Sequence, residues 1–230
     1  MPNPTPLSKL PNFDPRRIPA TGSDAHLQAV DADRLRPDAL MRRFASPPRW
    51  TPEVSVERRF ADRALTRASV LIPIVVHATP TVLLTERTGH LSTHSGQVAF
   101  PGGKADDDDL NAVATALREA EEEVGLGGGF VQVLGELPTY LTGTSFIITP
   151  VVALVRPGFL LRPNPHEVAQ VFEVPLEFLM NPANHRHHAF EWDGVRREWL
   201  SMPYLDQASE RFIWGATAGM LRNFYRFLMA

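Results

Sequence analysis

Four short apolar runs occupy the middle of the chain and predict β-strands. Each is rich in β-branched residues and bounded by Gly or Pro, and several are apolar at almost every position, as in strands buried on both faces. The runs span residues 70–76, 81–87, 130–137 and 146–155. Further along, Asp193 and Gly194 lie at the centre of the segment 187–200, and this pair favours a tight turn between two strands.

Helices follow a different spacing. Between the second and third runs, Ala112, Ala116, Ala120 and Val124 recur every four residues and predict a helix over 111–124. The glycine that follows Val124 ends this helix. Less regular patterns predict three further helices, over 32–44, 176–180 and 213–229. The aromatic residues of the last helix interleave with Leu and Met, which indicates core packing rather than a surface for stacking nucleobases.

The N-terminal region has a different texture. The first 52 residues contain ten of the 21 prolines, so this region cannot form one regular element. We interpret residues 1–66 as a Pro-rich N-terminal extension with one short helix, packed on or trailing from a domain that spans 67–230. Residues 1–23 are expected to be disordered.

Composition and charge narrow the function classes. A chain of 230 residues with 43% apolar and 21% charged residues is typical of a soluble globular protein. The net charge of -3 gives no reason to expect nucleic acid or a membrane as a partner. Cysteine is absent, which excludes disulfides, thiolate nucleophiles and zinc-thiolate sites. The sequence contains neither a run of about 18 apolar residues nor a signal-peptide core, so we expect a cytoplasmic protein.

Three carboxylates converge on one face of the helix predicted over 111–124. Glu119, Glu122 and Glu123 stand at i, i+3 and i+4, whereas Glu121 points elsewhere. Like charges at this spacing repel one another, and a solvated acidic face is the simplest interpretation. The alternative is a metal site, because Mg²⁺ is usually shared between a few carboxylates, waters and substrate phosphates.

The residues around the carboxylates favour the metal. Arg118 can brace a carboxylate, and the glycines of the turn at 101–103 let backbone groups approach a metal or a phosphate closely. The stretch 103–126 resembles the Nudix box. In that pattern Gly is followed after five residues by Glu, and after seven more by Arg-Glu, an aliphatic, any residue, Glu-Glu, any residue, Gly and an aliphatic. The second half, REAEEEVGL, fits with Ala120 in the aliphatic slot.

The first half of the box departs from the pattern. Six positions on from Gly103 lies Asp109, whereas eight positions back from Arg118 lies Leu110, so the loop is one residue longer than the pattern. The register of the three glutamates is unaffected. A Walker A phosphate loop is excluded, because the Gly-Lys pair is followed by Ala105.

A second, narrower resemblance precedes the box. The segment 83–103 is similar to the signature of the coenzyme A pyrophosphatase branch of Nudix hydrolases, in which Leu-Leu-Thr-x-Arg leads to Gly-x-x-x-Phe-Pro-Gly-Gly. Arg87 and Gly96 fall in place. Ser92 stands where the branch usually has Arg, and Thr88 where it has Ser or Ala. The resemblance implies an α/β fold, namely a Nudix-type α/β/α sandwich around a mixed β-sheet. Residues 67–230 would form this Nudix hydrolase domain.

The resemblance also implies roles for the carboxylate helix. Glu119, Glu122 and Glu123 would bind Mg²⁺ or Mn²⁺, with the carbonyl of Gly103 as an extra ligand. Arg118 would orient these carboxylates. The general base varies within the family, and a box glutamate (Glu122 or Glu123) and Glu167, which follows the Pro-rich turn at 162–166, are both candidates.

Cationic and imidazole side chains supply the remaining candidates. Arg87 and Lys104 are the local cations for phosphate. His94 lies in the signature segment and could contact substrate or make a structural hydrogen bond. The cluster His185, His187 and His188 follows a turn and is expected to be solvated on a loop, because a hard cation would not select it.

The expected function is metal-dependent hydrolysis of the diphosphate of coenzyme A or an acyl derivative. Another Nudix pyrophosphatase, acting on ADP-ribose or a dinucleotide, is the alternative within the enzyme class. A non-catalytic nucleotide-binding regulator is the alternative outside it. The expected partner is a nucleotide-type small molecule rather than nucleic acid or a membrane, and a homodimer is compatible with the sequence.

Overall fold

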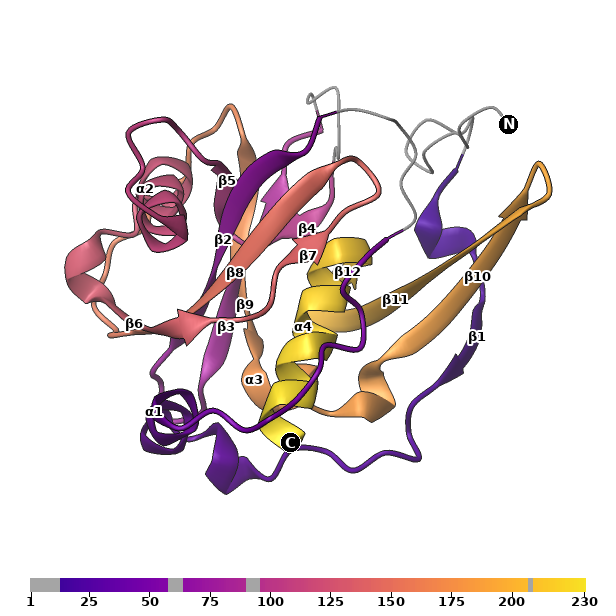
Figure 1. Cartoon of the computed structure of the whole chain (residues 1–230), viewed down its shortest axis with the longest axis horizontal. Coiled ribbons are helices and arrows are strands. Elements are labelled where there is room, and N and C mark those ends of the chain that lie inside the picture. The colour runs from indigo at the N-terminus through magenta and orange to yellow at the C-terminus, as the bar shows by residue number, and fades with distance from the viewer. Residues whose placement is uncertain (1–12, 58–63, 90–95, 207–208) are drawn as a thin grey trace.

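The computed structural model describes residues 13–57, 64–89, 96–206 and 209–230, and its centre is a mixed β-sheet (Figure 1). Within these ranges five strands follow one another in the order β4-β3-β2-β8-β6, and β5, β7 and β9 pair with β2, β8 and β3. The strands are β2 (Thr66–Val75), β3 (Thr81–Arg87), β4 (Val98–Ala99), β5 (Gly102–Lys104), β6 (Val131–Glu136), β7 (Tyr140–Leu141), β8 (Phe146–Val155) and β9 (Val168–Pro175). The four apolar runs correspond to β2, β3, β6 and β8, which confirms the predicted strands.

The two central strands are apolar on both faces. β2 pairs with β8 in parallel along its whole length. Because successive side chains of a strand point to opposite faces, Leu71 and Val75 pack against α2 (Ala112–Val124), whereas Ile72 and Ile74 join the cluster around α4 (Gly215–Met229). The two apolar clusters explain why these runs lack the alternation of a half-exposed strand.

Helices cover both faces of this sheet. In Figure 1, α2 lies on one side of the mixed sheet, and α4 lies on the other side, beside a second sheet. This arrangement is the α/β/α sandwich around a mixed sheet that the sequence predicts. In the ranges that the structure describes, no helix is long and apolar enough to cross a bilayer.

The second sheet has four strands in the order β1-β10-β11-β12. They are β1 (Ala20–Ser23), β10 (Arg186–Trp192), β11 (Val195–Asp206) and β12 (Ser209–Trp214). Asp193 and Gly194 join β10 to β11 with φ angles of 52° and 67°. Positive φ at both central residues is the geometry of a two-residue hairpin turn, which confirms the predicted hairpin.

Helix α2 forms as the alanine spacing predicts. Asn111 caps its N-terminus by accepting a hydrogen bond from the Ala114 backbone N–H at 2.9 Å, and Gly125 ends it at a φ of 72°. The predicted C-terminal helix begins later than expected. Residues 213–214 belong to β12, and α4 starts only at Gly215, whose φ of 62° turns the chain. The helix predicted over 176–180 is α3 (Leu176–Leu179).

The N-terminal extension is more ordered than expected where it is described. β1 pairs with β10 although residues up to 23 were expected to be disordered, because an exposed edge strand is held by backbone hydrogen bonds that leave no apolar pattern. The helix predicted over 32–44 is two pieces, η3 (Ala32–Leu35) and α1 (Pro37–Ala45). Pro37 starts the second piece because proline is favoured at the first position of a helix. The remaining short 3₁₀ helices are η2 (Pro15–Arg17), η4 (Gly128–Phe130) and η5 (Pro182–Asn184).

A buried arginine ties the extension to the last helix. The side chain of Arg222 on α4 is 3% exposed and lies 3.0 Å from Asp24 and 2.9 Å from Glu53, both in the extension. A third contact joins Arg222 Nη1 to His185 Nδ1 at 3.1 Å. The guanidinium therefore neutralises two carboxylates that the extension brings to the core.

The histidine cluster is not solvated on a loop, which corrects the expectation. His185 and His188 are 0% and 5% exposed, and only His187 is partly open to solvent. The imidazole of His185 lies between the Leu179 carbonyl and Arg222, and burial lowers its pKa to about 4. The ring of His188 stacks on Trp199 across the β10–β11 ladder. These contacts assign both rings to the protein core.

We expect Arg222→Met to destabilise the fold by about 3 kcal/mol, because it leaves a largely buried Asp24 without its guanidinium. Arg226→Met is the matched control. Arg226 lies on the same helix at 3.5 Å from Glu53, but its side chain is 47% exposed, so its loss should cost less than about 1 kcal/mol. Denaturant unfolding measures both. Equal losses of stability in the two variants would contradict the proposed role of Arg222 in holding the extension against α4.

Candidate active site

The acidic end of α2 packs directly on the glycine strand β5. A Cβ atom at Gly103 would overlap the carboxyl group of Glu119, and one at Gly102 would overlap the backbone of Ser69 and Val70 on β2. At Gly102 the overlap is with backbone, so only glycine allows β5 to approach β2 this closely. At Gly103 the overlap is with the end of the Glu119 side chain, so the absent side chain leaves the space that this carboxyl group occupies.

Arg118 pairs with several charged groups on this helix and next to it. Its guanidinium donates to Asp109 through Nε at 3.1 Å and Nη2 at 2.8 Å, a bidentate pair. It also donates to Glu119 at 3.1 Å and to Glu122 at 3.0 Å, and Nη2 reaches the Lys104 carbonyl at 3.0 Å. The pairing with Asp109 raises the pKa of Arg118 and lowers that of Asp109. Asp109 therefore holds the arginine beside the glutamates.

Glu123 is a buried carboxylate with few partners. Its side chain is 5% exposed, it accepts a hydrogen bond from the Gly102 N–H at 3.1 Å, and Arg87 lies 3.6 Å away. Burial raises its pKa to about 7, and the neighbouring charges of Glu167 and Glu119 add to this effect. The positive charge within reach does not compensate for the lost hydration of this carboxylate.

Glu119 and Glu167 share the same electrostatic environment. Burial raises the pKa of Glu119, and the negative charges of Glu122 and Glu167 raise it further. Glu167 reaches this region from the loop before β9, where Asn164 Nδ2 donates to its carboxylate at 3.3 Å. The backbone N–H of Asn164 in turn donates to the carbonyl of Glu123 at 2.8 Å. Four carboxylates from two elements therefore act on one another.

The donor set fits a hard divalent cation. Two of the glutamates are desolvated and repel their neighbours, a situation that an added cation relieves, and carboxylate oxygens are the ligands that Mg²⁺ and Mn²⁺ prefer. Among the described residues no three acidic or histidine side chains already converge on a common centre. In this arrangement Arg118 bridges Glu119 and Glu122.

The other predicted residues have mixed placements. Arg87 lies at the site, beside Glu123. Lys104 is exposed, and its carbonyl rather than its ammonium makes the described contact with Arg118. His94 and Ser92 lie outside the described residues. Asp109, which had no role in the sequence analysis, is the main partner of Arg118, and the one-residue-longer loop explains why counting along the box left its role open.

A model of the NUDIX domain family matches residues 65–211. Together with the relatives below, this match shows that the chain belongs to the Nudix hydrolase family. The match starts at the beginning of β2 and ends within β12, and α4 follows it.

Two similar proteins come from Yersinia pestis and Yersinia pseudotuberculosis, both named "Uncharacterized Nudix hydrolase NudL". Each is 44% identical over 158 residues, which cover 68% of this chain and 77% of the relative. Among solved structures, a MutT/nudix family protein from Enterococcus faecalis matches with a TM-score of 0.43 and 16% identity, covering 72% of this chain and 63% of that one. An Ap4A hydrolase from C. elegans matches with a TM-score of 0.42 and 18% identity, over 52% and 86% of the two chains.

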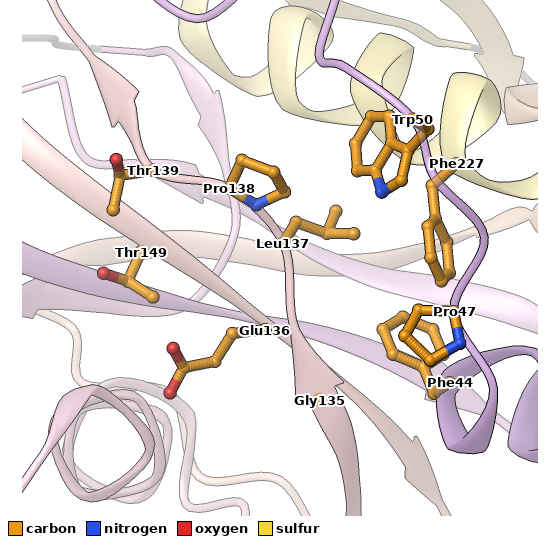
Figure 2. Close-up of a pocket in the computed structure, with 10 residues that line it drawn as sticks. All are labelled: Phe44, Pro47, Trp50, Gly135, Glu136, Leu137, Pro138, Thr139, Thr149 and Phe227. Atoms are coloured by element: carbon orange, nitrogen blue, oxygen red, sulfur yellow. The ribbon is translucent and has the colours of Figure 1, made fainter.

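A groove of about 520 Å³ lies at the edge of the mixed sheet, apart from the carboxylates of α2 (Figure 2). Figure 2 shows Glu136, Thr139 and Thr149 on one side of the strand segment that forms its floor, and the side chains of Phe44, Pro47, Trp50 and Phe227 on the other. The ten lining residues are Phe44, Pro47, Trp50, Gly135, Glu136, Leu137, Pro138, Thr139, Thr149 and Phe227.

We expect Glu123→Gln to stabilise the metal-free protein, because it removes a charge that is costly to bury while an amide oxygen can still accept from Gly102. The pKa of Glu123 is raised from 4.5 to about 7, so the wild type loses stability as the pH rises through this window. The variant should therefore gain stability relative to the wild type over the same window, by about 3 kcal/mol. Denaturant unfolding with a chelator present measures the gap. A variant less stable than the wild type above pH 7 would contradict the assignment.

Proposed function

We propose that this Nudix hydrolase cleaves the diphosphate of coenzyme A or an acyl-coenzyme A in the presence of Mg²⁺ or Mn²⁺. The products are 4′-phosphopantetheine, or its acyl form, and adenosine 3′,5′-bisphosphate. The observation that carries the proposal is the cluster of desolvated carboxylates on α2 against the glycine strand, preceded by a segment similar to the signature of the coenzyme A branch.

We assign different roles at this site to different residues. Glu119, Glu122 and Glu123 would hold the divalent cations, with the carbonyl of Gly103 as an additional ligand. When bound, the cations would neutralise charge on the diphosphate and lower the pKa of water. Arg118, anchored on Asp109, positions the glutamates from outside the ligand set.

Two further roles concern the substrate and the proton. Arg87 lies beside Glu123, where its guanidinium can reach a phosphate oxygen, and Lys104 adds an exposed positive charge at the end of β5. We propose Glu167 as the general base. Its charge lies close enough to affect Glu123, but it comes from the loop before β9 and not from α2. It would take the proton of the attacking water.

Glu122→Gln should lower turnover by roughly 100-fold or more at saturating metal, since it removes a ligand charge while preserving size and helix propensity. Glu121→Gln is the control on the same helix. Glu121 is exposed, and Arg118 pairs with Asp109, Glu119 and Glu122 instead, so the Glu121 variant should stay within about twofold of the wild type. Near-wild-type turnover of Glu122→Gln would refute the metal assignment.

The substrate proposal is tested by kcat/KM for coenzyme A, its 3′-dephospho form and ADP-ribose, each with Mg²⁺ and with Mn²⁺. Coenzyme A should be the best of the three, because its 3′-phosphate can add a charged contact worth about 1.5–3 kcal/mol. Mass spectrometry of the products locates the cleaved bond. A preference for ADP-ribose would retain the family and overturn the substrate. Binding of all three without turnover would favour a nucleotide-binding regulator.

A further inference from the structure

The groove at the sheet edge lies in register with the carboxylate site. Gly103 on β5 pairs with Ser69 on β2, and Ser69 pairs with Thr149 on β8. Paired residues of adjacent strands project to the same face, and neighbouring strands are about 4.8 Å apart, so Thr149 lies about 10 Å from Gly103. Since Glu119 rests on Gly103, the groove begins two strands away from the proposed metal ligands.

The charges on the two sides of the carboxylate site differ. On the β3 side, Arg87 stands beside Glu123. On the β8 side, Glu136 is the one charged residue among the ten that line the groove. Arg43 lies behind Phe227, but its guanidinium is bound to the backbone carbonyls of Phe227 and Leu228. A phosphate-rich group is therefore favoured beside Arg87 and disfavoured in the groove.

The groove changes character from one side of its floor to the other. Its end nearest the carboxylate site carries the hydroxyls of Thr139 and Thr149 and the carboxylate of Glu136 (Figure 2). All three groups can accept hydrogen bonds, and the two hydroxyls can also donate them. Its far end is formed by the rings of Trp50 and Phe44, which pack with Phe227. The floor is formed by the end of β6, the last strand in the order of the mixed sheet, and by residues 137–139, which follow it.

That order leaves the outer edge of β6 without a strand partner in the described ranges, so backbone N–H and C=O groups face outward there. Such an edge suits a ligand that itself carries amides, because each amide can donate to and accept from the backbone. A ligand that matches the groove would therefore carry polar groups near the reacting centre, amides in its middle and an apolar tip.

We propose that this groove binds the neutral, amide-bearing arm of the substrate, while the phosphate-rich nucleotide lies on the Arg87 side. The inference rests on the proposed function for its choice of arm, which in coenzyme A is pantetheine. It also assigns an acyl group to the aromatic end, near Trp50. The groove then determines which of the two halves of the diphosphate faces each side of the carboxylate helix.

Each of the two reaction products carries one of the two arms of the substrate. Product inhibition of the full-length enzyme therefore tests the proposal. Thr139→Trp places a ring over the polar end of the groove from an exposed position. It should weaken inhibition by 4′-phosphopantetheine by about tenfold and leave inhibition by adenosine 3′,5′-bisphosphate unchanged. Gln132→Trp, which places the same ring at an exposed position of β6 outside the groove, should change neither constant. Weakened inhibition by the bisphosphate alone, or no change in either, would overturn the proposal.

A binding measurement keeps the test independent of turnover. Pantetheine, which carries no phosphate, should shift the indole N–H resonance of Trp50 in the wild type at millimolar concentration, and the shift should be lost in Thr139→Trp. This measurement reads binding to the groove and not hydrolysis, whereas the kcat/KM comparison reads hydrolysis, so failure of the groove proposal and failure of the substrate proposal are distinguishable. Shifts confined to other tryptophans, or none, would overturn the groove assignment.

Discussion

The close contact between α2 and β5 is the constraint on which the site depends. Gly102 and Gly103 have no side chains to separate the helix from the sheet, so the carboxyl group of Glu119 rests on the backbone of β5. The same approach lets the Gly102 N–H reach Glu123. A side chain at Gly103 would displace the carboxyl group of Glu119, and one at Gly102 would clash with the backbone of β2. The contact therefore couples the packing of the fold to the electrostatics of the site.

That electrostatic arrangement is unfavourable without a cation. Glu119 and Glu123 are desolvated beside other carboxylates, and Arg118 divides its guanidinium between Asp109 and two of the glutamates. A fold selected only for stability would not retain a buried charge with so few partners, because such a charge is costly. The cost is understandable where ligand binding relieves it, and strained or desolvated groups of this kind are characteristic of functional sites.

Much of this architecture follows from the sequence, and the remainder has physical reasons for being hidden. Alanine every four residues predicts α2, and continuous apolar runs predict the buried strands, because both patterns arise from local geometry. The pairing of β1 and the burial of His185 depend on segments far apart in the chain. The edge groove is hidden for the same reason, since Trp50 comes from the extension and Phe227 from the last helix. The link from Asp109 to Arg118 spans only nine residues, but it depends on the conformation of the loop before α2.

The most direct test of this account is Mn²⁺ binding to the full-length protein, measured by electron paramagnetic resonance without substrate. The wild type should bind Mn²⁺, Glu121→Gln should bind it equally well, and Glu119→Gln should bind it at least about tenfold more weakly. Equal affinity in all three proteins would contradict the claim that the carboxylate face of α2 on the glycine strand is a metal site.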